Sequence, residues 1–265
     1  MNVAALRPFL GYGALRLSEN AGYSKYNSLQ ISAERRYSNG FKLSVAYTLG
    51  KSTDNASDKR DVVWNTYNDT SFWGPSSFDR RHVLVVSYIY DLPFWREQTG
   101  VLHNVLGGWQ ISGSTFMRSG TPFSITRSND IAGVGDGFAE PVDIVGDPNT
   151  NVNHQFSNGS DQNFFFNPAA FANPAAGHFG NSTRNILRQP GDQQWDLALF
   201  KNFKTYGSQT LQLRAEIFNF PNHPNLSNGN GGSGVISDIT DPNFGRVINK
   251  DNNRRDIQLA VRYIF

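Results

Sequence analysis

Cysteine is absent from the 265-residue sequence, which excludes disulfide bonds and thiolate metal sites and leaves no redox signal for a compartment. No apolar run reaches the roughly 18 residues that a membrane-spanning helix needs, so helical spans are excluded. Charged residues are scarce, at 17% of the chain, where about a quarter is usual in a soluble protein. The formal net charge of +2 is too small to indicate a nucleic-acid partner.

Patterns that would indicate an active site or a cofactor are also missing. The five histidines do not show the spacing of metal ligands. There is neither a Gly-x-Ser-x-Gly nucleophile motif nor a clear pair of catalytic carboxylates. Two acidic loops, residues 54–58 and 238–241, are weak candidates for calcium, because ordinary turn chemistry explains the same residues. We therefore expect a protein that is not an enzyme and that has no cofactor or resident metal.

Aromatic residues, by contrast, make up 13% of the chain, although the mean hydropathy of −0.47 is polar. The last eleven residues alternate between apolar and polar side chains, with Ile264 as the one exception. A period of two predicts a β-strand with one apolar face. In a bacterial outer-membrane barrel such a face contacts lipid, and a terminal aromatic residue lies in the interfacial girdle. The apolar set of this C-terminal strand is Ile257, Leu259, Val261, Tyr263 and Phe265.

Segments of this kind recur along the chain at the length of about ten residues that a tilted membrane strand needs. Long connections, residues 52–81, 120–194 and 221–254, alternate with shorter ones, as the external loops and periplasmic turns of an outer-membrane barrel do. Asn39-Gly40 predicts a tight hairpin, and residues 101–106 have helical spacing. The predicted strands are residues 9–17, 26–37, 41–51, 82–92, 109–119, 195–203, 210–220 and 255–265.

These features predict an all-β fold, namely an antiparallel transmembrane β-barrel segment of about eight strands with long external loops and short periplasmic turns. A closed barrel of about eight strands has room only for packed side chains, whereas the inward set here is rich in charged and amide residues. Unpaired sheet edges are not tolerated in lipid. We therefore expect further strands in the parent protein, and a partial, open sheet if this chain stands alone.

Two basic residues, Arg35 and Lys201, share the parity of the apolar set. A charge at that parity costs about 2–4 kcal/mol in the middle of the membrane and about 0–1 kcal/mol near an interface. Both residues fall near predicted periplasmic ends, so we expect their long side chains to snorkel to water.

An external loop contains four aromatic residues that have two interpretations. Exposed aromatic side chains are costly unless they pack together or bind something, so this loop either packs on itself or contacts an external ligand such as a sugar or a peptide. The adjacent cluster Arg80-Arg81-His82 is a ligand clamp or, as is more usual, a strand end at the level of the lipid headgroups. The four aromatic residues are Trp64, Tyr67, Phe72 and Trp73.

A succession of short motifs covers nearly the whole chain and resembles the C-terminal barrel portion of TonB-dependent outer-membrane receptors, in particular the Oar-like, carboxypeptidase-regulatory-like group. The sequence departs from this pattern at Pro221, where an aromatic residue is expected. The motifs include Tyr26-Asn27-Ser28-Leu29-Gln30, Asp79-Arg80-Arg81-His82, Gly107-Gly108-Trp109-Gln110-Ile111-Ser112-Gly113, Phe166-Asn167-Pro168-Ala169-Ala170-Phe171 and Arg214-Ala215-Glu216-Ile217-Phe218-Asn219.

The resemblance implies that residues 1–265 are the C-terminal part of a receptor barrel of about 22 strands, without its plug domain. It implies import of a scarce or bulky ligand (a siderophore, an oligosaccharide or a peptide) across the cell outer membrane. The implied partners are outer-membrane lipid, the barrel-assembly machinery through the C-terminal strand, and TonB only through the missing N-terminal part. Residues 1–8 do not form a signal peptide, so we expect the natural N-terminus to lie upstream.

A soluble or surface-anchored β-sandwich, acting as a binding module or adhesin, is the alternative from another class. A sandwich would bury residues such as Leu197, Leu213, Leu259 and Val261 between two sheets. A membrane barrel would expose the same residues in a continuous apolar band. A hydrolase, the third hypothesis, would need a clustered set of catalytic groups.

Overall fold

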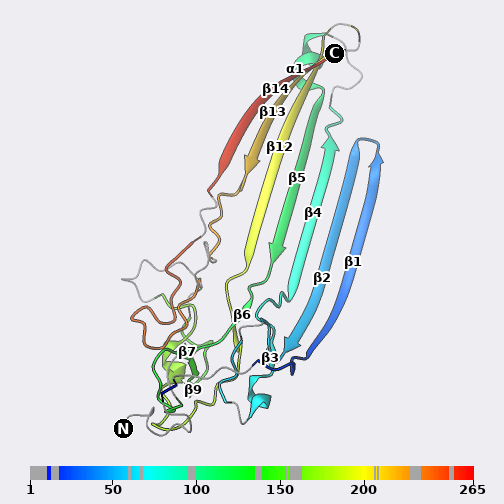
Figure 1. Cartoon of the computed structure of the whole chain (residues 1–265). Coiled ribbons are helices and arrows are strands. Elements are labelled where there is room, and N and C mark those ends of the chain that lie inside the picture. The colour runs from blue at the N-terminus through cyan, green and yellow to red at the C-terminus, as the bar shows by residue number, and fades with distance from the viewer. Residues whose placement is uncertain are drawn as a thin grey trace.

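A single antiparallel sheet dominates the computed structural model, which describes residues 11–12, 18–58, 61–65, 68–94, 100–134, 139–152, 154, 163–205, 207, 209–226, 234–250 and 254–265. Within these ranges Figure 1 shows long strands side by side, in the spatial order β1-β2-β4-β5-β12-β13-β14. A short strand, β3 (Gly74–Pro75), pairs with the end of β2. The long strands are β1 (Ser24–Ser38), β2 (Phe41–Asp54), β4 (His82–Asp91), β5 (Trp109–Arg118), β12 (Asp192–Lys204), β13 (Thr210–Phe218) and β14 (Asp256–Ile264).

The register keeps the two alternating sets of side chains on opposite faces of the sheet. Residues opposite each other in neighbouring strands share a face. A shift by one residue would move every side chain of a strand to the other face. The row across the sheet that contains Leu259 continues through Ala215, Leu199, Ile111, Tyr90 and Phe41, and we call its side the apolar face. The adjacent row, Gln258, Glu216, Ala198, Ser112, Ile89 and Lys42, lies on the polar face.

The strands predicted from residue 26 onward are confirmed, with shifts of up to three residues at their ends. β2 continues to Asp54 and β12 begins at Asp192, because pairing extends beyond the alternating core of each strand. β13 ends at Phe218, two residues before its predicted end, because Asn219 has a left-handed φ of 48° that turns the chain out of the strand. The first candidate, residues 9–17, falls almost entirely outside the described residues.

The predicted hairpin and the predicted helix are both present. Asn39 and Gly40 have φ values of 54° and 78°, which is the conformation of a two-residue hairpin loop. Ser38 pairs with Phe41 across this turn. The helix α1 (Val101–Leu106) lies beside the start of β5, at the same end of the sheet as the Asn39-Gly40 hairpin (Figure 1). We call this the turn end of the sheet and the opposite end the loop end. Among the described residues, no helix has the length and apolarity to span a membrane.

The sheet is open, and β1 and β14 form its two edges. Each strand along the path from β1 to β14 is antiparallel to the next. After six reversals the two edge strands run in the same direction. Direct pairing of one edge with the other would therefore be parallel, which is not the pairing of outer-membrane barrels.

The described parts of the connections 120–191 and 234–250 fold into a compact cluster at the end of the sheet opposite α1 (Figure 1), and we call this cluster the loop cap. Three pairs of two-residue strands brace it: β6 (Pro122–Phe123) with β11 (Leu187–Arg188), β7 (Thr126–Arg127) with β8 (Glu140–Pro141), and β9 (Asp143–Ile144) with β10 (Phe171–Ala172). A 3₁₀ turn, η3 (Pro168–Ala170), precedes β10, and another, η2 (Asp69–Phe72), precedes β3.

The loop cap has a hydrophobic core of its own, which the sequence analysis missed by treating these segments as loops. Each fully buried large apolar side chain stabilises the fold by roughly 1.5–3 kcal/mol. Gly180 permits close packing, because a Cβ atom there would lie 2.3 Å from the backbone carbon of Val142. The buried residues of this core are Phe123, Ile125, Val142, Phe166, Ala170, Phe171, Val235, Phe244 and Val247.

The two faces of the sheet can be tested with spin labels, because an introduced cysteine is the only cysteine in the chain. A nitroxide on Leu213→Cys, on the apolar face, should collide more often with dissolved oxygen than with a water-soluble nickel complex. The order should reverse for Ser114→Cys on the polar face, because oxygen partitions into lipid and the complex stays in water. Power-saturation EPR in lipid vesicles measures both collision rates, and equal accessibility at the two positions would contradict the assignment of faces.

Candidate functional site: the apolar face, the polar groove and the loop cap

The apolar face is open to its surroundings. Leu259 is 79% exposed, Val261 70% and Phe265 94%, and Leu213 further inside the sheet is also exposed. Within the described ranges, the large sheet is the only one longer than two strands, so no second sheet covers this face. A β-sandwich would bury these residues between its sheets, whereas an apolar face turned toward hydrocarbon is not covered by other parts of the protein.

Aromatic side chains with polar tips lie at both ends of the apolar face. Tyr47 hydrogen-bonds His82 Nδ1 at 2.8 Å near the loop end. Near the turn end the Trp109 indole N–H donates to the carbonyl of Val105 at 3.1 Å, and the Tyr263 hydroxyl donates to Gln209. Rings with an apolar body and a satisfied polar tip suit the two membrane–water interfaces.

Lys201 corrects one prediction about this face. It is only 3% exposed and does not reach water. Its ammonium group donates to the carbonyl of Gly107, in the connection after α1. It also lies 4.7 Å from the ring centre of Phe203 and 5.6 Å from that of Trp109. A backbone carbonyl and two aromatic faces thus replace water for this charge, whereas Arg35 is exposed with its guanidinium 5.2 Å over Phe41.

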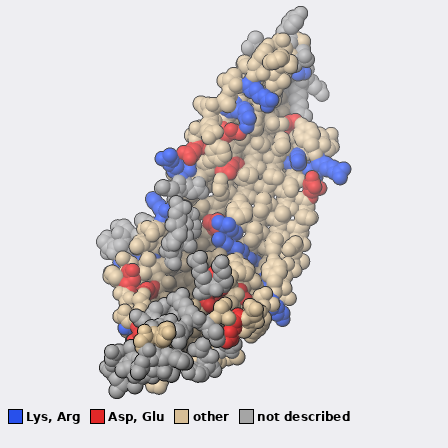
Figure 2. All heavy atoms as spheres, viewed as in Figure 1, with Lys and Arg blue, Asp and Glu red and all other residues tan. Residues whose placement is uncertain are grey.

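The polar face carries a groove of about 360 Å³ near the middle of the sheet. Small hydroxyl side chains form its floor, so the backbone of the central strands can be approached closely. Figure 2 shows that the middle of the sheet in this view is largely uncharged, with acidic and basic groups toward its margins. Glu216 is paired with Arg214, and Asp196 accepts the backbone N–H of Asn219 at 3.1 Å. The polar side chains of the lining are Lys42, Ser87, Ser112, Ser114, Asp196 and Glu216.

Tyr88 and Gly113 form a close cross-strand pair on the apolar face. A Cβ atom on Gly113 would lie 2.6 Å from the Tyr88 hydroxyl oxygen, so the tyrosine ring occupies the space above the glycine. Such aromatic cover over a strand glycine helps to define register.

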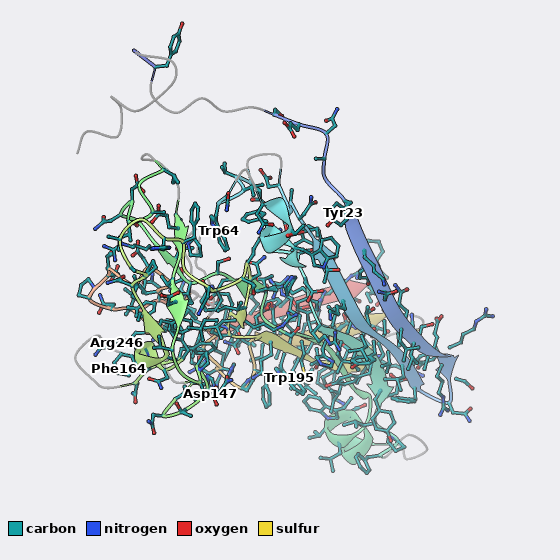
Figure 3. The ribbon with its side chains drawn as sticks, turned by 90° about the horizontal axis from the view of Figure 1, so that it is seen from below. Tyr23, Trp64, Asp147, Phe164, Trp195 and Arg246 are labelled. Atoms are coloured by element: carbon teal, nitrogen blue, oxygen red, sulfur yellow. The ribbon has the colours of Figure 1, made fainter. Side chains whose placement is uncertain are left out.

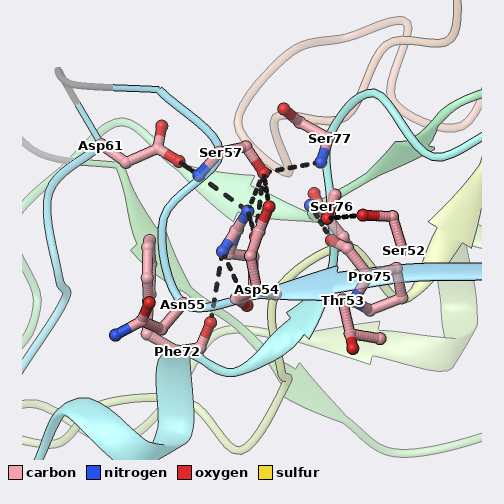
Figure 4. Close-up of polar contacts among 12 residues, drawn as sticks. Ser52, Thr53, Asp54, Asn55, Ser57, Asp61, Phe72, Pro75, Ser76 and Ser77 are labelled. Atoms are coloured by element: carbon pink, nitrogen blue, oxygen red, sulfur yellow. Dashed lines mark hydrogen bonds and ion pairs between the residues drawn. The ribbon is translucent and has the colours of Figure 1, made fainter. Parts of the chain in front are cut away.

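A buried ion pair joins the loop cap to the end of β2 (Figure 4). Arg184 Nη2 lies 2.6 Å from Asp54 Oδ1, and the two side chains are 5% and 2% exposed. Arg184 Nη1 donates to the carbonyl oxygens of Asp54 and Phe72, and the guanidinium lies 5.0 Å over the Phe72 ring. Ser57 completes the network by donating to the Asp54 carboxylate at 2.9 Å. The pair is therefore surrounded by hydrogen bonds, which a buried charge requires.

Three further ion pairs follow along the same segment, which leads from the cap into β12. Arg188 binds the carboxylate of Asp79, which also accepts the backbone N–H of Ser52 at 2.6 Å. Asp192 binds Arg80 at 3.1 Å and Arg118 at 2.6 Å. Residues 184, 188 and 192 thus form a strap that is fixed to the end of β2, to the connection before β4 and to the end of β5. No local pattern in the sequence indicated these pairs, since their partners lie up to 130 residues away.

The aromatic loop packs in part on itself. Phe72 is 6% exposed and meets Trp64 edge to face at 5.1 Å. Trp73 stacks on Tyr23, with ring centres 4.7 Å apart. Figure 3 shows Trp64 among the loops and Tyr23 at the start of β1. Tyr67 lies outside the described residues, and contact of this loop with a ligand stays a prediction.

The remaining sequence candidates have structural roles in the described residues. Arg80 and His82 are engaged by Asp192 and Tyr47, as described above. Asp54, from the first acidic loop, is committed to Arg184, and Asp238, from the second, accepts hydrogen bonds from Ser128 and Thr240. Burial favours a higher pKa for Asp238, but these hydrogen bonds outweigh it and lower the pKa. Within the described ranges, no three His, Cys, Asp or Glu residues gather as a metal-binding group.

The comparisons with known proteins give one match. Residues 1–258 match the family model described as an outer membrane beta barrel domain. No curated protein and no solved structure matches the chain.

The Arg184–Asp54 pair should control how firmly the loop cap is held. Arg184→Met leaves a buried carboxylate unpaired, which costs about 3–5 kcal/mol, so the opened cap should become more than about a hundredfold more populated. The rate of cleavage by a dilute protease reports that population when opening is fast. Arg254→Met is the control, because the Arg254–Asp256 pair is exposed and should have almost no effect. Equal cleavage of both variants would show that the buried pair does not hold the cap.

Proposed function

The chain belongs to the family of outer membrane beta barrel domains, and from that premise we propose that it is the C-terminal part of a TonB-dependent receptor. Integral insertion in the outer membrane follows from the family and agrees with the exposed apolar face. The proposal adds that the parent protein imports a scarce or bulky ligand. The single observation that carries the proposal is an open sheet with an exposed apolar face on one side and a polar, grooved face on the other.

The directions of the edge strands support a parent barrel larger than this chain. β1 and β14 run the same way, so antiparallel closure needs an odd number of additional strands between them. A barrel with only one more strand would have about eight strands and a lumen filled by packed side chains. The polar face instead carries Lys42, Asp196 and Glu216 around a groove. A wider barrel, in which these groups face water or a plug, suits them better.

The folded loop cap supports a receptor rather than an open pore. A cap with its own hydrophobic core and a buried ion-pair strap can present a fixed surface at the external end of the barrel. We propose that ligand recognition involves this end, with Trp64 and Trp73 as candidate contacts beside the buried Phe72. The ligand class stays open among siderophores, oligosaccharides and peptides.

The C-terminal strand has a separate proposed role in assembly. Its outer edge is unpaired in the described sheet, and its apolar set ends on the exposed Phe265. We propose that the barrel-assembly machinery binds this strand before the barrel closes. TonB would act only through an N-terminal part that lies outside this sequence, so this stretch alone would not couple energy to import.

Growth of the source bacterium tests the import proposal. Cells that lack the gene encoding this chain, and cells that lack TonB function, should fail on the same nutrient when iron–siderophore complexes, oligosaccharides or peptides are offered singly as the source of iron, carbon or nitrogen. The shared defect is expected because import needs both the barrel and the energy that TonB transmits. Restoring the gene provides the control. The contradicting result is a nutrient on which cells without the gene fail to grow, whereas loss of TonB function alone does not reduce growth. In that case import through the barrel would not depend on energy transmitted by TonB.

A further inference from the structure

The charged residues on the apolar face of the sheet all have the same sign. Where the described long strands are paired in register, this face carries four lysine or arginine residues and no acidic one. An acidic residue costs less than a basic one on the lipid side of a barrel strand, so contact with hydrocarbon does not explain the bias. A negatively charged partner outside the sheet does. The basic residues are Lys25, Arg35, Lys51 and Lys201, and the acidic residues of these strands, all on the polar face, are Glu34, Asp54, Asp91, Asp192, Asp196, Glu216 and Asp256.

Lys25 and Lys51 lack the contacts that the other two basic residues have. Near the turn end, Lys201 is buried against a carbonyl and two rings, and the Arg35 guanidinium lies over Phe41. Lys25 and Lys51 are exposed near the loop end of β1 and β2, which run side by side in Figure 1. Within the described part of the chain, neither ammonium group has an ion-pair or hydrogen-bond partner. Both charges are therefore available to a partner outside the sheet.

The register places two neutral polar residues beside the two lysines. Lys25 is opposite Thr53, and Asn27 is opposite Lys51. Directly opposite side chains have Cβ atoms about 4.5–5.5 Å apart, and diagonal ones lie about 7–8 Å apart. Two long lysine side chains can therefore reach the same anion, and the amide of Asn27, which adjoins both, adds a neutral donor.

The position of these residues along the strands matches the level of the lipid headgroups. Lys51 is ten residues beyond Phe41 on β2, and Phe41 lies at the turn end. At about 3.4 Å per residue and a tilt of about 35–45°, this distance is roughly 24–28 Å along the membrane normal. The apolar band of an outer-membrane barrel is about 25 Å tall, so Lys51 lies where the band ends. Tyr47, which is hydrogen-bonded to His82, lies just below that level, as an interfacial aromatic residue does.

We propose that Lys25, Asn27 and Lys51 bind a phosphate group of a phosphorylated glycolipid in the outer leaflet of the outer membrane. Ammonium and amide N–H groups are donors for phosphate oxygens, and the charged ones make the stronger bonds. Directly below on the same face, Leu29 lies opposite Leu49 and is 56% exposed. The acyl chains of the lipid lie against this pair while the headgroup meets the lysines. The proposal rests on the outer-membrane location of the chain and is independent of import.

Native mass spectrometry of the full chain, folded in a nonionic detergent, tests this site with diphosphorylated lipid A as the probe. Each basic residue at a membrane surface strengthens attraction to an anionic headgroup about fivefold, so removing the phosphates from lipid A should weaken binding about tenfold or more. An equal concentration of inorganic phosphate should not displace lipid A, because a free ion gains nothing from the apolar face. Three results would each overturn the proposal: no binding of lipid A, equal binding of the dephosphorylated lipid, or displacement by phosphate.

Two double variants locate the site on the protein. Lys25→Gln combined with Lys51→Gln should weaken binding of lipid A about tenfold or more, because both ammonium groups are lost. Lys204→Gln combined with Arg262→Gln is the matched control, because it removes two exposed basic residues from the polar face. Binding by the control should be unchanged. Equal weakening by both double variants would assign the attraction to net charge alone and would also contradict a site at Lys25 and Lys51.

Folding of every variant is checked by the heat-dependent shift in gel migration that outer-membrane barrels show. All four substituted residues are exposed, so the variants should fold. The comparison of the two forms of lipid A uses the wild type alone and tests the proposal even if a variant does not fold. A chain that binds lipid A but whose gene is not needed for import would contradict the import proposal and leave this site in place.

The converse result, import without a phosphate-dependent affinity for lipid A, would overturn this site and leave the import proposal in place.

Discussion

Hydrocarbon offers no hydrogen-bond partner to a peptide group, and the rest of this structure depends on that constraint. It requires every strand to be paired on both sides within the membrane, which explains the long, regular register from β2 to β14. It also explains why one set of alternating side chains can be almost wholly apolar while the opposite set remains polar. The two edges, β1 and β14, are the places where the described sheet leaves this requirement unmet.

Charge is handled differently at the two ends of the sheet. At the turn end, Lys201 has no carboxylate partner among the described residues and is stabilised by a backbone carbonyl and two aromatic rings. At the loop end, Arg184, Arg188 and Asp192 are paired with opposite charges from the end of β2, the connection before β4 and the end of β5. The loop cap can therefore be both water-exposed and rigid, because its attachment depends on buried, directional contacts in addition to its apolar core.

The sequence was sufficient for the strands because their alternation is local. The set from Ile257 to Phe265 and the Asn39-Gly40 turn each predict their own geometry without reference to the rest of the chain. The core of the cap could not be predicted in this way, because Ile125, Val142 and Val235 come from segments without a period and meet only after the chain has folded. The prediction that the Lys201 side chain reaches water was wrong for a related reason. The alternation showed which face Lys201 lies on, but it could not show that the carbonyl of Gly107, in another connection, lies within hydrogen-bonding distance.

The strap at residues 184–192 also has a mechanical meaning. Its three anchors are spaced four residues apart and attach in order to Asp54, to Asp79, and to Arg80 and Arg118 together. A pull transmitted through β12 would load the anchor at Asp192 first and the one at Arg184 last, so the anchors would rupture one at a time rather than together. The aromatic segment behind Asp54 would then be the final part to come loose, and modest tension from inside the barrel could slacken one side of the cap while the other stayed in place.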